Sequence, residues 1–149
     1  MTNGDGAPGA ELRRLDALVG MWTTRGQTVA GPSIEIAGTD TYEWVAGGFF
    51  LLHTIDVFMG EDHVEAIEVI GAYDRSSETF AMTSFDNQGA VGMMRASVNA
   101  DGSWTFAGDA ERATLTIADD GTGMSARWER TDDGSSWHPW MDLRFTRLR

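Results

Sequence analysis

Apolar positions recur along this chain with two different periods, one after the other. Between residues 10 and 19, Leu12, Leu15, Leu18 and Val19 lie three or four positions apart or adjacent, which predicts one short amphipathic helix ending at Gly20. Beyond Gly20, apolar and polar residues alternate, and turns rich in Gly, Asp and Asn separate the alternating segments. This alternation predicts strands over residues 21–29, 34–45, 49–59, 63–73, 79–86, 91–98, 103–108, 112–117, 124–131 and 137–148.

These segments predict an all-β domain of about ten sequential antiparallel strands preceded by one short helix. Strands and helices do not alternate, so a parallel sheet is not expected. Closing such a sheet into an up-and-down barrel removes its exposed edges, which favours the barrel over the alternative of a two-sheet sandwich. We expect a flexible leader over residues 1–9 and a single domain over residues 10–149.

The start of the first strand carries a family resemblance. Gly20-Met21-Trp22, directly after the helix, resembles the Gly-x-Trp signature of the calycin barrels, which include the lipocalins and fatty-acid-binding proteins. The resemblance implies an arginine on the last strand that packs over Trp22 at the closed end of the barrel, and Arg144 and Arg147 are the two candidates. The segments at 39–50, 71–74 and 85–89 are similar to those of a family of small bacterial proteins of unknown function, over residues 15–147. That likeness implies the calycin-type barrel and supplies no activity.

A second resemblance concerns haem. The nitrobindins, which are haem-binding barrels of the same kind, carry a glycine-repeating motif after their tryptophan and a C-terminal histidine that ligates the iron. In this chain Gly26 is followed by Gln27-Thr28, so the glycine pattern is incomplete, and His138 is the histidine to compare with that ligand. We therefore expect no cofactor, with nitrobindin-like haem binding as an alternative.

Composition narrows the classes of partner. The chain has 11 basic residues, all arginine, against 23 acidic ones, for a net charge of −12. A surface of this sign repels phosphate backbones and anionic lipid, so neither nucleic acid nor a membrane is an expected partner. There is no cysteine, which excludes disulfides and thiolate sites, and no lysine, which excludes Schiff-base chemistry. Without a signal-peptide pattern the expected location is the cytoplasm.

Strand parity suggests which side chains enter the lumen, because residues in a small barrel alternate between inside and outside. If Trp22 points inward, the lumen is aromatic and methionine-rich with a few polar groups, as expected of a pocket for a partly polar small molecule. The candidate ligand-binding residues are Asp40, Tyr42, Trp44, His53, Tyr73, Met82, Ser84, Arg95 and Trp128. The alternative is that these side chains simply fill the barrel.

Two of these candidates leave alternatives open. An inward-facing His53 could orient a ligand or act as an acid or base, or it could be hydrogen-bonded to a neighbour such as Tyr42 or Asp40. Arg95 follows two methionines, so its parity is ambiguous: facing inward it would pair with a ligand carboxylate, and facing outward it is a surface charge. The spacing of the three histidines matches no metal-binding pattern, so no metal site is expected.

The sequence thus favours a binding module that holds a small apolar or amphipathic ligand in its lumen. The alternative from another class is an isomerase or cyclase, which would require groups such as His53, Asp40, Tyr42 or Arg95 to converge on one cavity. Exposed aromatics at Phe50, Phe58 or Trp140 leave a homodimer open.

Overall fold

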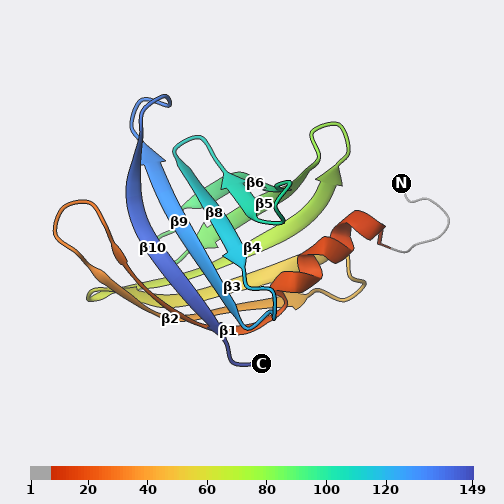
Figure 1. Ribbon diagram of the computed structural model, residues 1–149, viewed down its shortest axis with the longest axis horizontal. Coiled ribbons are helices and arrows are strands. Elements are labelled where there is room, and N and C mark those ends of the chain that lie inside the picture. The colour runs from red at the N-terminus through yellow and green to blue at the C-terminus, as the bar shows by residue number, and fades with distance from the viewer. Residues whose placement is uncertain (1–7) are drawn as a thin grey trace.

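The structure, a computed structural model, describes residues 8–149 and is a closed ten-stranded antiparallel barrel (Figure 1). The leader expected over residues 1–9 lies almost wholly outside the described residues. A 3-10 helix, η1, spans Ala10–Leu18. The strands are β1 (Gly20–Thr28), β2 (Glu35–Trp44), β3 (Phe50–Met59), β4 (Asp62–Asp74), β5 (Thr79–Asp86), β6 (Val91–Val98), β7 (Trp104–Ala107), β8 (Glu111–Ile117), β9 (Gly123–Thr131) and β10 (Trp137–Arg147).

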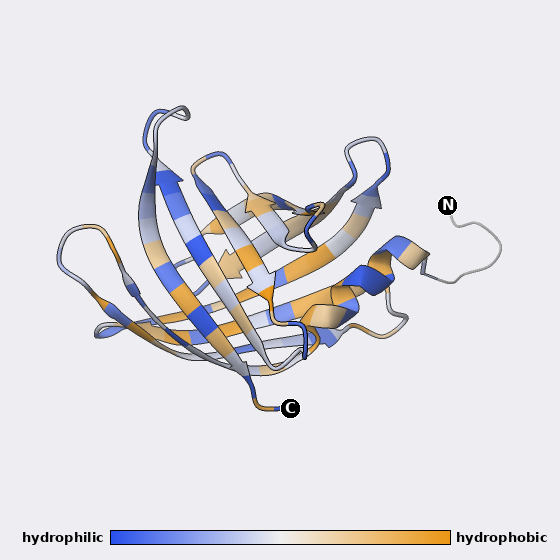
Figure 2. Cartoon of the chain, viewed as in Figure 1, coloured by the Kyte–Doolittle hydropathy of each residue, from blue (hydrophilic) through white to orange (hydrophobic). Residues whose placement is uncertain are grey.

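Closure of the sheet decides between the barrel and the sandwich. Every strand pairs with the next, and β10 returns to pair with β1 over the register from Trp22 opposite Arg147 to Thr28 opposite Met141. The expected ten-stranded up-and-down barrel is therefore confirmed. Hydrophobic and hydrophilic residues alternate along several of the strands, as Figure 2 shows, because successive side chains point into and out of the barrel. Among residues 8–149, no helix is long and apolar enough to cross a membrane.

One end of the barrel is sealed by η1 and by Trp22. Leu12, Leu15 and Leu18 of η1 are buried, and Trp22, fully buried at the start of β1, donates its indole N–H to the Leu18 carbonyl over 2.9 Å. The helix is thus held over the barrel by both an apolar face and a hydrogen bond.

Arg147 completes this closed end. Its guanidinium lies 4.2 Å from the centre of the Trp22 ring and donates to the backbone carbonyl groups of Val19 at 2.5 Å and Gly121 at 2.8 Å. Of the two candidate arginines, Arg147 is therefore the one that covers the tryptophan, whereas Arg144 is exposed on the outer face. The same contact explains the glycine of the Gly-x-Trp motif: Gly20 has φ +143, and a Cβ there would overlap the Arg147 side chain.

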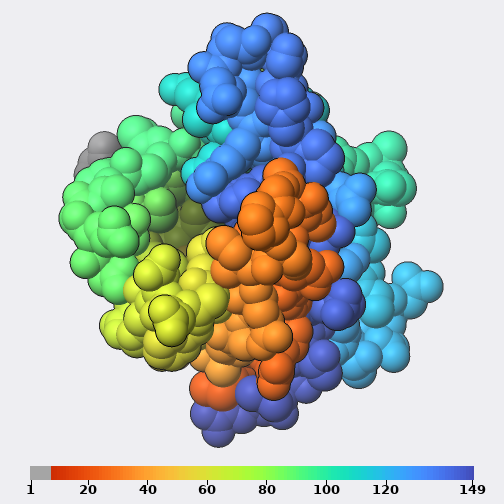
Figure 3. Space-filling model, turned by 90° about the vertical axis from the view of Figure 1, so that its left-hand side faces the viewer, coloured from red at the N-terminus to blue at the C-terminus, as the bar shows by residue number. Residues whose placement is uncertain are grey.

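The opposite end is open. The turns β1–β2, β3–β4, β5–β6, β7–β8 and β9–β10 all lie at this end, because the strands run alternately up and down. Figure 3 views the molecule from this side and shows a hollow between the segments coloured yellow, green and blue. The barrel is therefore closed at the η1 end and open at the opposite end.

Candidate functional site

A cavity of about 310 Å³ occupies the lumen between the closed end and the mouth. All ten strands contribute to its wall, which is mostly apolar and includes Met82, Met94, Leu115, Trp128 and Phe145. Side chains that filled the lumen completely would leave no such space. The barrel therefore contains a cavity and is not fully packed.

The polar part of the wall is concentrated on three neighbouring strands. His53 of β3 lies between two carboxylates: its Nε2 is 2.6 Å from Asp40 Oδ2 of β2, and its Nδ1 is 3.0 Å from Glu68 Oε1 of β4. All three residues are buried, with exposed fractions of 8% or less. The register of the sheet sets this cluster, because His53 is directly opposite Glu68 across one strand pair and opposite Tyr42, two residues from Asp40, across the other.

Two further residues fix the orientation of this cluster. The Thr24 hydroxyl donates to Asp40 Oδ1, the carboxylate oxygen that His53 does not use. The Tyr42 ring stacks on the imidazole, with ring centres 3.9 Å apart and planes inclined by 11°. The imidazole therefore has a fixed plane, and both of its nitrogens have fixed partners.

The environment of His53 determines its charge. Burial alone would lower the pKa of the imidazole, but the hydrogen bonds to Asp40 and Glu68, together with the two negative charges, raise the pKa to about 9. Below that pH both ring nitrogens carry a proton and donate, so the ring has no lone pair to offer. Burial and the same carboxylates raise the pKa of Tyr42 well above its ordinary value of 10.0, which keeps its phenol neutral. Counted formally as two carboxylates and one imidazolium, the cluster of Asp40, His53 and Glu68 has a charge of −1.

The structure places the sequence-derived site residues in two groups. Those that line the cavity are Asp40, Tyr42, His53, Met82, Ser84 and Trp128. Trp44, Tyr73 and Arg95 do not: Trp44 donates to Asp16 of η1 at 2.8 Å, and Tyr73 packs against Phe80. Arg95 is exposed and donates to Thr79 at 3.1 Å, so its ambiguous parity resolves to the outside and it pairs with nothing in the lumen.

The sequence reasoning missed several lumen groups, of which Glu68 is the most informative. Glu68 lies on the inward face of β4. The other residues on that face, Val64, Ala66 and Ile70, are apolar. A single carboxylate on an apolar stripe is a detectable sign of a buried polar group. Thr24, Asp86, Glu111 and Trp140 also line the cavity without having been singled out as ligand-binding residues.

A family model matches residues 7–147, nearly the whole chain, and its description is "Protein of unknown function (DUF1579)". The chain belongs to the DUF1579 family. The resemblance to a family without an assigned activity is thereby confirmed. No curated protein matches the sequence.

Two solved structures share the fold of this DUF1579 barrel. Rv2717c from M. tuberculosis superposes with a TM-score of 0.70 at 16% identity, over 95% of this chain and 99% of that one. The S-type phycobiliprotein lyase CPES from Guillardia theta superposes with a TM-score of 0.64 at 11% identity, over the same shares of the two chains. At these identities the likeness concerns the fold alone.

Neither of the two histidines that could be compared with a haem ligand is placed to bind an iron in the lumen of this DUF1579 barrel. His53 lines the cavity, but both of its nitrogens are protonated and bonded to carboxylates. His138 of β10 is exposed and is absent from the cavity wall. Neither histidine of this pair offers a lone pair to the lumen.

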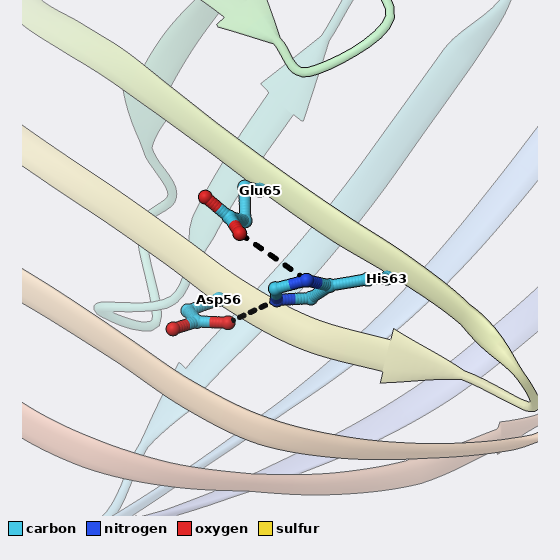
Figure 4. Close-up of side chains that lie close together, drawn as sticks. All are labelled: Asp56, His63 and Glu65. Atoms are coloured by element: carbon cyan, nitrogen blue, oxygen red, sulfur yellow. Dashed lines mark hydrogen bonds and ion pairs between the residues drawn. The ribbon is translucent and has the colours of Figure 1, made fainter.

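A second histidine lies between carboxylates on the outer face of the DUF1579 barrel (Figure 4). His63 of β4 has Nε2 2.7 Å from Asp56 and Nδ1 3.2 Å from Glu65, and its ring stacks on Phe58. The potential ligand atoms lie within 4.8 Å of one another, a grouping that residue spacing did not predict because it joins two strands. All three side chains are exposed, and each ring nitrogen already faces a carboxylate, so the cluster is a surface counterpart of the buried one.

Proposed function

We propose that this barrel binds a small, largely apolar organic molecule in its lumen. The observation that carries the proposal is the cavity of about 310 Å³, with apolar walls and a single buried polar cluster formed by Asp40, His53 and Glu68. Ligand sites are typically concave and mostly apolar, with a few placed polar groups, and their volumes run from about 300 to 1,000 Å³. The ligand therefore belongs to the smaller end of that range.

The protonation of His53 favours ligand binding over acid–base catalysis as the function of the lumen. A general base needs a nitrogen lone pair within reach of a substrate proton, and the imidazolium between Asp40 and Glu68 has none. Arg95, one of the candidate groups for an isomerase or cyclase, is on the outer face. The phycobiliprotein lyase supports a ligand-handling barrel only through its shared fold.

The proposal is tested with a neutral aromatic probe, N-phenyl-1-naphthylamine, whose emission rises in apolar surroundings. We expect saturable binding, detected also as a change in tryptophan emission, because Trp128 and Trp140 line the cavity. Ala126 is a buried wall residue of β9, so Ala126→Phe fills the lumen and should abolish binding.

The matched control is Ala107→Phe, which adds the same ring at an exposed position on β7. It should bind the probe as the wild type does, and circular dichroism should show both variants folded. Wild-type protein without saturable binding, or undiminished binding by a folded Ala126→Phe variant, would contradict the proposal.

A further inference from the structure

The charged groups around the cavity are nearly all of one sign. Among residues 8–149, four carboxylates line it, those of Asp40, Glu68, Asp86 and Glu111, and His53 is the only cationic side chain on its wall. Four negative charges against one positive give a formal charge of −3. No arginine of residues 8–149 lines the cavity, and Arg130, which lies next to its wall, has its guanidinium 3.3 Å from the centre of the Trp140 ring. A ligand carboxylate would meet repulsion here, whereas a cation would meet attraction strengthened by the apolar surroundings.

Glu68 provides the specific contact point. Its Oε1 accepts from His53, while no side-chain or backbone group of residues 8–149 donates a hydrogen bond to its Oε2. In the same part of the chain no fully enclosed side-chain oxygen or nitrogen lacks a partner, so this oxygen retains accessible surface. Glu68 is only 5% exposed and lines the cavity, so that surface faces the lumen. A carboxylate oxygen in this position can accept a hydrogen bond from an N–H or O–H group of a molecule in the cavity.

The aromatic wall suits the same kind of occupant. Phe106, Trp128 and Phe145 line the cavity from β7, β9 and β10, and aromatic faces attract cations, more strongly where water is excluded. Tyr42 adds a neutral phenol next to His53. Acidic groups and aromatic rings that face the same cavity are the combination that recognises an organic ammonium group.

We propose that the lumen selects a protonated amine: an apolar or aromatic molecule whose ammonium group donates a hydrogen bond to Glu68. This inference rests on the proposed function, since it assumes that the lumen binds a ligand. The ammonium group loses its hydration on entry, and the Glu68 carboxylate together with the net negative cluster offsets that cost. For a fatty acid of the same size, the imidazolium of His53 is already paired with Asp40 and Glu68 through both nitrogens, and the carboxylates of the wall repel the ligand's own carboxylate.

Three compounds with one skeleton test the charge preference directly on the wild-type protein: 4-phenylbutylamine, 4-phenylbutanol and 4-phenylbutyrate. Their affinities are measured at pH 7 by calorimetry and by displacement of N-phenyl-1-naphthylamine. The alcohol can also donate a hydrogen bond to Glu68 but carries no charge, so only the ammonium group gains the attraction of the carboxylate, and the amine should bind at least about tenfold more tightly than the alcohol. The butyrate should bind more weakly than the alcohol.

A pair of variants tests whether the preference for the amine depends on Glu68 of β4. Glu68→Gln should remove most of the amine's advantage over the alcohol, although Asp40, Asp86 and Glu111 remain. Glu65→Gln, the same change at an exposed position on β4, should leave both affinities unchanged. If Glu68→Gln does not fold, the relative affinities of the three compounds for the wild-type protein test the inference. An alcohol or butyrate that binds as tightly as the amine overturns this inference alone. Absence of binding by the neutral probe and all three compounds overturns the proposed function as well.

Discussion

The buried imidazolium makes the stability of the barrel depend on pH in a predictable direction. The pKa of His53 rises from 6.5 in the unfolded chain to about 9 in the folded protein. Because the folded pKa is the higher one, the stabilisation is complete below pH 6.5 and is lost as the pH rises through 9. A shift of this size corresponds to a stabilisation on the order of 3 kcal/mol, since each pKa unit is worth about 1.4 kcal/mol.

Urea unfolding of the wild-type protein between pH 6 and pH 10 measures this effect. Between pH 6.5 and 9 the folded protein retains a proton that the unfolded chain has released, so the free energy of unfolding should fall by about 1.4 kcal/mol per pH unit. The proton is assigned by following the imidazole carbon resonances of His53, which should keep their protonated positions at pH 8.

The matched control is His63→Gln, which removes the exposed histidine between Asp56 and Glu65. Exposed ion pairs contribute little and are screened, so this variant should keep the wild-type slope. A free energy of unfolding that is constant from pH 6.5 to 9, or a slope that disappears in His63→Gln, would refute the assignment to His53.

Two further predictions concern the scaffold. Arg147→Ala should lower the free energy of unfolding by about 2 kcal/mol, because it exposes the Trp22 ring and leaves backbone carbonyl groups without a charged donor. The control Arg144→Ala, on the exposed outer face, should change the free energy of unfolding by less than about 0.5 kcal/mol. Gly26→Ala should destabilise by more than about 2 kcal/mol, because its Cβ would overlap the backbone of β10. Gly123→Ala, whose Cβ meets only an ordinary contact at 3.6 Å, should be nearly neutral, and both glycine variants are compared by urea unfolding.

Much of the fold could be predicted because its determinants are local. Alternation along each strand and the Gly- and Asp-rich turns gave all ten strands, with ends that differ from the observed ones by a few residues. The choice between Arg144 and Arg147 was also encoded locally. Arg147 has the parity of the buried Leu143 and Phe145, so it faces the inside of the barrel, and Arg144 does not.

The polar cluster was harder to predict because its members meet only through strand register. Asp40, His53 and Glu68 are 13 and 15 residues apart and lie on three strands, so their contact depends on how each hairpin is paired. A shift of one residue in either pairing would turn one of these side chains to the outer face. The parity of Arg95 was ambiguous for a related reason, and it is settled by Met82 lying opposite Met94, which places Arg95 outside.

The position of the cluster within the barrel argues that the fold does not require it. The closed end is sealed by Trp22, the leucines of η1 and Arg147, and none of these contacts involves His53. Replacing buried ion pairs by apolar residues of similar volume is often neutral or stabilising, so a barrel selected for stability alone would carry an apolar lumen here. Instead, the sequence departs from an apolar interior at the level where the cavity begins and where Glu68 presents an oxygen to it. Departures of this kind are expected at functional sites, which is why the lumen is the place to look for the ligand.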